Sequence, residues 1–127
     1  MTTHTEFANV AEELEWRGAL FDATPGALHA LATEKVMCYN GFDPTASSLH
    51  IGNLVPIMGL VRLQRHGHTP IALVGGGTGM IGDPSGRVEE RTLMSIPQID
   101  ENVDAIRLQL EPFLDFNVKP NPARIVN

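Results

Sequence analysis

The first part of the chain shows apolar residues at helical spacing. Between residues 6 and 20 they recur with acidic and amide side chains between them: Phe7, Val10, Ala11 and Leu14. This spacing predicts an amphipathic helix. The turn-forming sequence DATPG interrupts it at residues 22–26, and the segment ALHALATEK predicts a second, short helix. We therefore expect the chain to begin with a helical arm.

A strand, a helix and a second strand are predicted next. VMCYNGF, residues 36–42, is rich in β-favouring residues and is followed by a turn-forming Asp-Pro pair. Residues 51–66 carry apolar positions on one helical face, with Pro56 near the start, where a missing N–H costs least, and Gly67 placed to end the helix. TPIALVGG, residues 69–76, is a continuous apolar run typical of a buried parallel strand.

The last third of the chain predicts another helix and the start of a third strand. After a glycine-rich loop at residues 75–86, apolar residues recur at spacings of three and four between residues 97 and 115: Ile99, Val103, Ile106, Leu110 and Leu114. Pro97 fits the first turn of this helix, and Pro112 should kink or end it. NPARIVN predicts a strand. The order of elements predicts an α/β fold with a parallel sheet and right-handed crossovers.

Composition narrows the class of protein. The chain has 127 residues, 43% of them hydrophobic, which is enough for one globular domain. Fifteen acidic against nine basic residues give a net charge of -6, so any contact with RNA must be local. No apolar run is long enough for a membrane span, and the N-terminal residues lack a signal-peptide pattern, so we expect a cytoplasmic protein. A single cysteine, Cys38, excludes a disulfide framework and a thiol metal cluster.

The glycine-rich loop matches two phosphate-binding patterns incompletely. GTGMIG, residues 77–82, has the dinucleotide-binding spacing, but Asp83 and Pro84 follow and favour a turn where that motif requires a helix. Asp83 also stands where a P-loop needs its lysine, and a carboxylate there would repel phosphate. It would instead suit a cation such as the ammonium group of an amino acid. The alternative is a surface loop whose glycines only permit tight turns.

The segment YNGFDPTASSLHIGN, residues 39–53, joins the first predicted strand to the following helix. It therefore lies at the carboxyl edge of the predicted sheet, where α/β folds bind ligands. The first N–H groups of the helix would face an anion, His50 could donate to it, and Gly52 would let a ligand approach the backbone. An imidazole there would best stabilise charge developing on a phosphorus. The alternative is that His50 only caps the helix or packs against it.

These motifs resemble one enzyme family. YNGFDPTASSLHIGN, followed by HTPIALVGGGTGMIGDPSGRVEERTL, is similar to the N-terminal part of bacterial-type tyrosyl-tRNA synthetases, which are class I aminoacyl-tRNA synthetases. The HIGH-type motif also occurs in other nucleotidyl-transfer enzymes, whereas GFDPTA and IGDPSG are similar to the tyrosine branch. The resemblance implies an N-terminal helical arm at residues 1–33. Residues 34–127 would form the first half of a Rossmann-like, parallel-sheet nucleotide-binding domain.

The resemblance implies a tyrosine–tRNA ligase. Such an enzyme activates L-tyrosine with ATP and Mg²⁺ to tyrosyl-adenylate and then transfers the tyrosyl group to tRNA(Tyr). ATP is a substrate, and no protein-bound metal site is implied. Family members are homodimers with longer chains, so the KMSKS-type loop and most tRNA contacts would lie beyond Asn127. We accordingly expect this chain to end inside a domain and to be inactive and poorly stable by itself.

The resemblance also implies roles for individual residues. The phenol of tyrosine would meet Tyr39, its ammonium Asp83, and its ring Leu73 and Thr78. ATP would contact Asn40 at the ribose, the backbone of Gly41 and Asp43, and Gly52 beneath the adenine. Thr45 and His50 would stabilise the phosphates during attack. The HIGH-type motif comprises Pro44, Thr45, Ala46, Ser47, Ser48, Leu49, His50, Ile51, Gly52 and Asn53.

Two positions depart from the family pattern. Asn53 replaces the second histidine of the HIGH-type motif; its amide can still bond to a ribose but cannot carry charge. Arg87 stands where a lysine is frequent, and with Arg91 it could meet the pyrophosphate. Alternatively, both arginines are solvated charges beside Glu89 and Glu90.

Two other functions remain open from the sequence. A truncated relative could bind tyrosine or its adenylate without performing chemistry. A dinucleotide-dependent oxidoreductase is also possible, but it would rest on GTGMIG alone and would leave GFDPTASSLHIGN unexplained.

Overall fold

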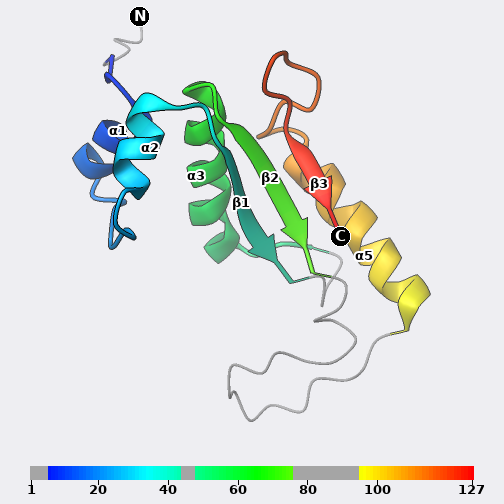
Figure 1. Cartoon of the computed structure of the whole chain (residues 1–127). Helices are drawn as coiled ribbons and strands as arrows, with labels where there is room; N and C mark the ends of the chain where they lie inside the picture. The colour runs from blue at the N-terminus through cyan, green and yellow to red at the C-terminus, as the bar shows by residue number, and fades with distance from the viewer. Residues whose placement is uncertain (1–5, 44–47, 76–94) are drawn as a thin grey trace, which may run out of the picture.

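The computed structural model describes residues 6–43, 48–75 and 95–127. Its sheet has three parallel strands in the order β1-β2-β3, formed by Met37–Phe42, Thr69–Val74 and Arg124–Val126 (Figure 1). Met37 pairs with Thr69, Phe42 with Val74, and Ile71 with Arg124. The predicted parallel α/β fold is therefore confirmed.

The helices α3 and α5 pack on one face of this sheet. α3 spans Leu54–Arg65 and follows a short 3-10 turn, η1, at Ile51–Asn53; α5 spans Ile96–Leu110. One hydrophobic core combines residues of both helices with residues of the sheet: Phe42, Ile57, Leu60, Val61, Ala72, Val74, Ile106 and Leu110, together with Leu114 and Ala123. This packing fixes the N-terminal end of α3 relative to the strands.

Burial alternates along β2, which differs from the fully buried strand predicted from its apolar run. Pro70, Ala72 and Val74 are buried on the face covered by the helices, whereas Ile71 and Leu73 are only half-buried. The reason is that the described helices cover only one face of the sheet. On the open face of β1, Met37 and Tyr39 are 60% and 71% exposed.

The helix boundaries differ in part from those predicted. The first predicted helix, residues 6–20, is shorter in the structure, where α1 spans Val10–Trp16. The second helix, α2, spans Ala27–Thr33. α5 ends at Leu110 rather than at residue 115. Leu110 lies two residues before Pro112, which agrees with the expectation that this proline ends the helix. α3 ends at Arg65, one residue before the predicted His66. The predicted role of Gly67 in ending it is confirmed, because Gly67 follows the C-cap residue His66 with φ of 89°, a conformation that glycine adopts easily.

A buried carboxylate joins the helical arm to the C-terminal end of α3. Glu13 of α1 accepts hydrogen bonds from Arg17 Nε at 2.7 Å and His66 Nε2 at 2.9 Å, and Arg62 Nε lies 3.7 Å away. Burial alone raises the pKa of Glu13, but the hydrogen bonds from His66 and Arg17 outweigh it and lower that pKa. The arm is therefore attached to α3 by an ionised side chain.

A buried histidine forms a second attachment. His68, 1% exposed, accepts at Nδ1 from the backbone N–H of Val36, at 3.1 Å, and also bonds to the backbone of Leu31. Burial, reinforced by the charge of Lys35, lowers the pKa of His68. A neutral His68 thus connects α2 to the beginning of β1.

Within the described residues, no helix is both long enough and apolar enough to cross a membrane.

Candidate functional site

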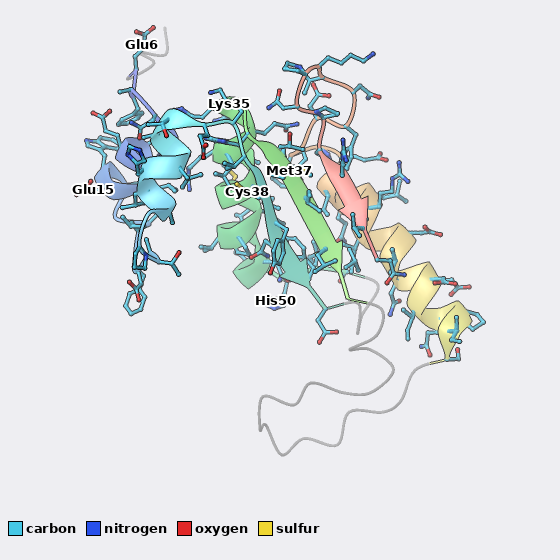
Figure 2. All side chains as sticks on the ribbon, in the orientation of Figure 1. Glu6, Glu15, Lys35, Met37, Cys38 and His50 are labelled. Carbon is cyan, nitrogen blue, oxygen red and sulfur yellow. The ribbon has the colours of Figure 1, made fainter. Side chains whose placement is uncertain are left out.

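The carboxyl ends of β1 and β2 define the edge at which the sequence predicts a ligand site. Gly75, just after β2, donates its N–H to the carbonyl of Phe42 at 3.0 Å, so the two strands leave the sheet side by side. Figure 2 shows His50 near these ends, whereas Met37 and Cys38 lie toward the opposite end of β1. His50 also stands at the N-terminal end of the helical segment formed by η1 and α3. The predicted placement of His50 at this edge is confirmed.

The imidazole of His50 caps η1. Its Nδ1 accepts a hydrogen bond from the N–H of Gly52 at 3.0 Å, and Asn53 Oδ1 accepts from the N–H of His50 at 3.0 Å. The His50 side chain thus accepts from a backbone N–H of η1, and the Asn53 side chain accepts from the backbone N–H of His50, which together form a capping box. The Gly52 N–H expected to face an anion, and the Asn53 oxygen, are both engaged inside the turn.

This cap determines which ring nitrogen can donate. A neutral imidazole carries one hydrogen, and an Nδ1 that accepts from Gly52 leaves that hydrogen on Nε2. The ring is exposed at the carboxyl edge of the sheet. His50 can therefore cap the turn and present an N–H donor to a bound group at the same time.

Gly52 leaves room for the close approach of that ring. A Cβ atom at residue 52 would lie 2.7 Å from Cε1 and 2.9 Å from Nδ1 of His50, closer than side-chain contacts allow. From the sequence, Gly52 is expected to allow close approach of a ligand. The structure identifies a different neighbour in the protein itself, the imidazole ring of His50.

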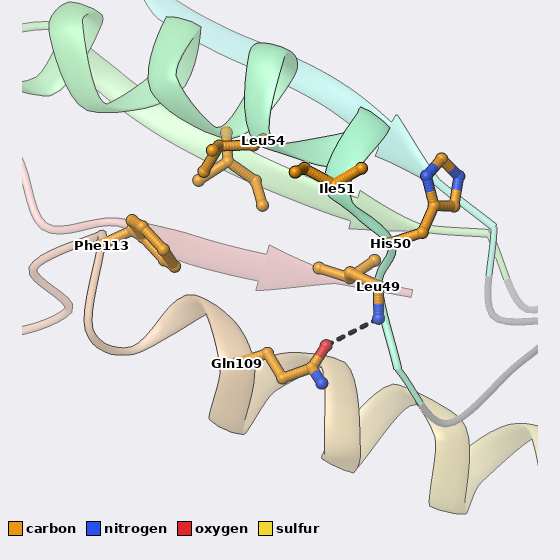
Figure 3. A pocket seen from close by; sticks show the side chains of 7 residues that line it. Leu49, His50, Ile51, Leu54, Gln109 and Phe113 are labelled. Carbon is orange, nitrogen blue, oxygen red and sulfur yellow. Dashed lines mark hydrogen bonds between the residues drawn. The ribbon is translucent and has the colours of Figure 1, made fainter.

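A groove of about 320 Å³ separates the His50 turn from α5 (Figure 3). Its lining is mainly apolar: Leu49, Ile51, Leu54, Ile57 and Phe113, with His50 and Gln109. Across the groove, Gln109 Oε1 accepts a hydrogen bond from the N–H of Leu49 at 2.7 Å. α5 is thus linked directly to the residue that precedes His50.

The predicted tyrosine-binding residues Tyr39 and Leu73 lie on the open face of the sheet. Gly41 is the register partner of Leu73, and Tyr39, two residues earlier on β1, is the partner of Ile71. Because strand residues alternate between faces, all four lie on the face opposite the helices. Asn40 points to the other face, and its side chain donates to the carbonyl of Gly41 at 3.0 Å. The structure therefore brings Tyr39 and Leu73 to one surface.

Several predicted site residues lie outside the described part of the chain. They are Pro44, Thr45, Ala46, Ser47, Thr78, Asp83, Arg87 and Arg91. The alternatives left open for the glycine-rich loop and for the two arginines therefore stay as predictions. Of the described residues, no group of three or more His, Cys, Asp and Glu side chains is placed to hold a metal ion.

Sequence reasoning did not identify Gln109 as part of this site. Gln109 and its partner Leu49 are 60 residues apart, and neither belongs to a local pattern that would connect them. Gln109 follows Leu108 and precedes Leu110 on a helix whose apolar spacing explains Leu110 but says nothing about a polar neighbour. Only the packing of α5 beside the His50 turn brings the pair together.

Known proteins that are similar to this chain are aminoacyl-tRNA synthetases. Residues 31–127 match the family model of the class I tRNA synthetases for tryptophan and tyrosine (W and Y). The chain is 53% identical over 118 residues to a tyrosine–tRNA ligase from Roseiflexus castenholzii and 56% identical over 119 residues to one from Cytophaga hutchinsonii. These alignments cover 93% and 94% of this chain but 28% of each relative, so the chain spans little more than a quarter of their length.

A solved structure is also similar. It is a C-terminally truncated mitochondrial tyrosyl-tRNA synthetase from Coccidioides posadasii, with a TM-score of 0.71 and 29% identity. The superposition covers 94% of this chain and 35% of that one. The likeness in structure therefore extends over the arm, the sheet and both core helices.

Proposed function

The chain belongs to the class I tRNA synthetase family of the tryptophan and tyrosine enzymes, and we propose that it provides the first part of a tyrosine–tRNA ligase. Residues 1–33 would be the helical arm, and residues 34–127 the first part of the catalytic domain. Identity above 50% to two tyrosine–tRNA ligases supports tyrosine rather than tryptophan as the substrate. This membership also accounts for GFDPTASSLHIGN, which an oxidoreductase would leave unexplained.

The proposed reaction has two steps. A carboxylate oxygen of L-tyrosine attacks the α-phosphorus of ATP, the bond to pyrophosphate breaks, and tyrosyl-adenylate forms; the tyrosyl group then passes to tRNA(Tyr). Mg²⁺ would enter with ATP as part of the substrate. Because the attacking carboxylate is already ionised, no strong base is needed, and catalysis depends on positioning and on stabilising charge.

The observation that carries this proposal is the position of His50. Its Nε2–H is the available donor of a ring fixed at Nδ1 by Gly52, at the carboxyl edge of the sheet. In the proposed complex this donor would bond to a phosphate oxygen as negative charge develops there. Thr45 would assist it, and Gly41, Asp43 and Asn53 would lie against the nucleotide. Tyr39 and Leu73 would receive the aromatic ring on the open sheet face, and Asp83 the ammonium group.

The net negative charge of this chain supports tRNA binding mainly by other regions of the ligase. With a net charge of -6, this chain is a poor broad surface for tRNA, so tRNA(Tyr) would be held mainly by other regions of the ligase. We further propose that the ligase acts as a homodimer in the cytoplasm.

Tyrosine-dependent exchange of pyrophosphate into ATP tests the proposal. The first sample is the 127-residue chain itself, which we expect to be inactive. The second is a chimera in which this chain replaces the matching segment of the Cytophaga hutchinsonii ligase, to which it is 56% identical. We expect exchange by the chimera with tyrosine and far less with phenylalanine. A folded chimera that binds tyrosine without exchange would support the non-catalytic binding hypothesis instead.

Two substitutions in the chimera separate the possible roles of His50. His50→Ala removes both the cap and the donor, whereas His50→Asn keeps a side chain that caps helices well. If Nε2 stabilises the transition state, both should slow exchange by about 100-fold with little change in tyrosine binding. Normal exchange by His50→Asn would show that capping is sufficient and would refute the proposed role.

A further inference from the structure

One side chain of α5 bonds to the backbone immediately before His50. Gln109 Oε1 accepts the N–H of Leu49 at 2.7 Å, a short distance for a hydrogen bond to an amide (Figure 3). The bonded N–H lies in the peptide unit between Ser48 and Leu49, one residue before His50, so a shift there moves the backbone that carries the imidazole. The contact joins two elements that are otherwise separated by the groove.

The other hydrogen bonds found for this turn lie inside it. His50 N–H donates to Asn53 Oδ1, Gly52 N–H to His50 Nδ1, and Asn53 N–H to the carbonyl of His50. They link residues within the turn, which runs directly into the N-terminal end of α3. The bond to Gln109 connects the backbone of this turn, at Leu49, to α5.

Apolar packing leaves room for the turn to move. Leu49 is half-buried against the core, but Ile51 is 88% exposed and Leu54 is 41% exposed. A groove of about 320 Å³ remains between these side chains and Phe113 of the segment after α5. Packing of α3 holds the turn at its Asn53 end, and the directional bond to Gln109 holds it at its Leu49 end.

We propose that Gln109 is a positioning residue for His50. Its hydrogen bond to Leu49 holds the turn at the distance from α5 at which Nδ1 of His50 meets Gly52 and Nε2 faces the ligand side. The catalytic consequence rests on the proposed function, whereas the effect on the geometry of the turn does not. Gln109 itself does not touch the reacting atoms.

Hydrogen exchange and NMR of the chimera test the geometric part, because the 127-residue chain is expected to be poorly stable by itself. Gln109→Met removes the acceptor at nearly constant length, and Gln109→Glu keeps an acceptor at the same place. Gln98→Met, at an exposed position of the same helix, is the matched control. We expect Gln109→Met to speed amide exchange about fivefold at Leu49 and also at Gly52, as loss of one exposed hydrogen bond should. The ring nitrogen shifts of His50 should move toward a mixture of tautomers.

The pattern of rescue decides the outcome. Gln109→Glu should restore both exchange rates and the His50 shifts, and Gln98→Met should change neither. Exchange at the core amides of Ile106 and Leu110 monitors global unfolding. Faster exchange at Leu49 alone, with Gly52 and the His50 ring unchanged, would overturn the proposal, as would equal changes at the core amides.

Kinetics of the chimera test the catalytic part separately. Gln109→Met should lower kcat about tenfold while KM for tyrosine stays the same, because a small displacement of a catalytic group costs rate rather than substrate binding. If a folded, unsubstituted chimera shows no pyrophosphate exchange, the proposed function fails, yet the hydrogen-exchange result still decides whether Gln109 positions His50. An active chimera with an unchanged kcat would overturn the catalytic role of the contact.

Discussion

Replacing Glu13 with glutamine should weaken the attachment of the helical arm. The carboxylate is 11% exposed and accepts two short hydrogen bonds, from Arg17 at 2.7 Å and from His66 at 2.9 Å. A hydrogen bond to a charged group contributes about 1.5–3 kcal/mol. Glutamine keeps one acceptor, and Arg17, whose side chain is 40% exposed, regains water when it is released. We therefore expect Glu13→Gln to lower the free energy of unfolding by about 2 kcal/mol, or Tm by about 8 °C.

The single tryptophan makes this prediction measurable. Trp16 lies on α1, its ring centroid is 5.5 Å from that of Phe7, and the guanidinium of Arg17 lies 5.7 Å from its ring. Urea unfolding followed by Trp16 fluorescence therefore reports the arm, and circular dichroism reports the whole fold. Glu15→Gln, an exposed position on the same helix, is the charge-matched control and should cost less than about 0.5 kcal/mol. Equal stability of the Glu13→Gln variant and the unsubstituted chain would refute the reasoning.

Two further predictions concern Gly52 and His68. Gly52→Ala should push the exposed His50 ring aside, because the new Cβ would stand 2.7 Å from Cε1 of the ring. We expect pyrophosphate exchange by the chimera to be at least tenfold slower. The free energy of unfolding should change by no more than about 1 kcal/mol. Normal exchange would contradict this. The pKa of His68 is lowered, so the stability that its neutral ring contributes is present above about pH 6.5 and is lost as pH falls below that value. The charged groups that face His68 are Lys35 and His66. The lowered pKa of Glu13 adds a second loss of stability below about pH 4.5. Urea midpoints from pH 4 to 8 should fall toward acid, and His68→Gln should remove the first step; a flat profile would contradict the assignment.

Elements with both a clear period and a clear end could be predicted closely. β1 was predicted at residues 36–42 and spans Met37–Phe42, and the helix predicted to begin at Ile51 does so as η1. The start of α1 was predicted too early because Phe7 fits the helical period. The helix instead begins after Asn9, whose side chain accepts from the N–H of Glu12 at 2.9 Å, and Phe7 packs on Trp16 from outside it. The start of α1 is therefore set by a local polar interaction, the cap at Asn9, and not by the apolar spacing that includes Phe7.

The site could be predicted only as far as it is local in sequence. The link between strand and helix placed His50 at the carboxyl edge, because any parallel strand followed by a helix does so. Glu13 with His66 and Leu49 with Gln109 are separated by 53 and 60 residues. Each pair consists of polar groups with no distinctive spacing, so a single sequence carries no signal that they meet. The contacts that hold the arm and the His50 turn in place follow from packing and became visible only in the structure.

The two interpretations of His50 offered by the sequence turn out to be compatible. A histidine that caps through Nδ1 must carry its hydrogen on Nε2, so the structural bond to Gly52 selects the tautomer that the proposed chemistry requires. An asparagine or serine would cap the turn equally well but would offer no donor at the far side of a ring. The cap is also suited to a glycine at residue 52, since a Cβ there would lie 2.7 Å from Cε1 of the ring. His50, Gly52 and Asn53 therefore act as one unit, and Gln109 sets where that unit stands relative to α5.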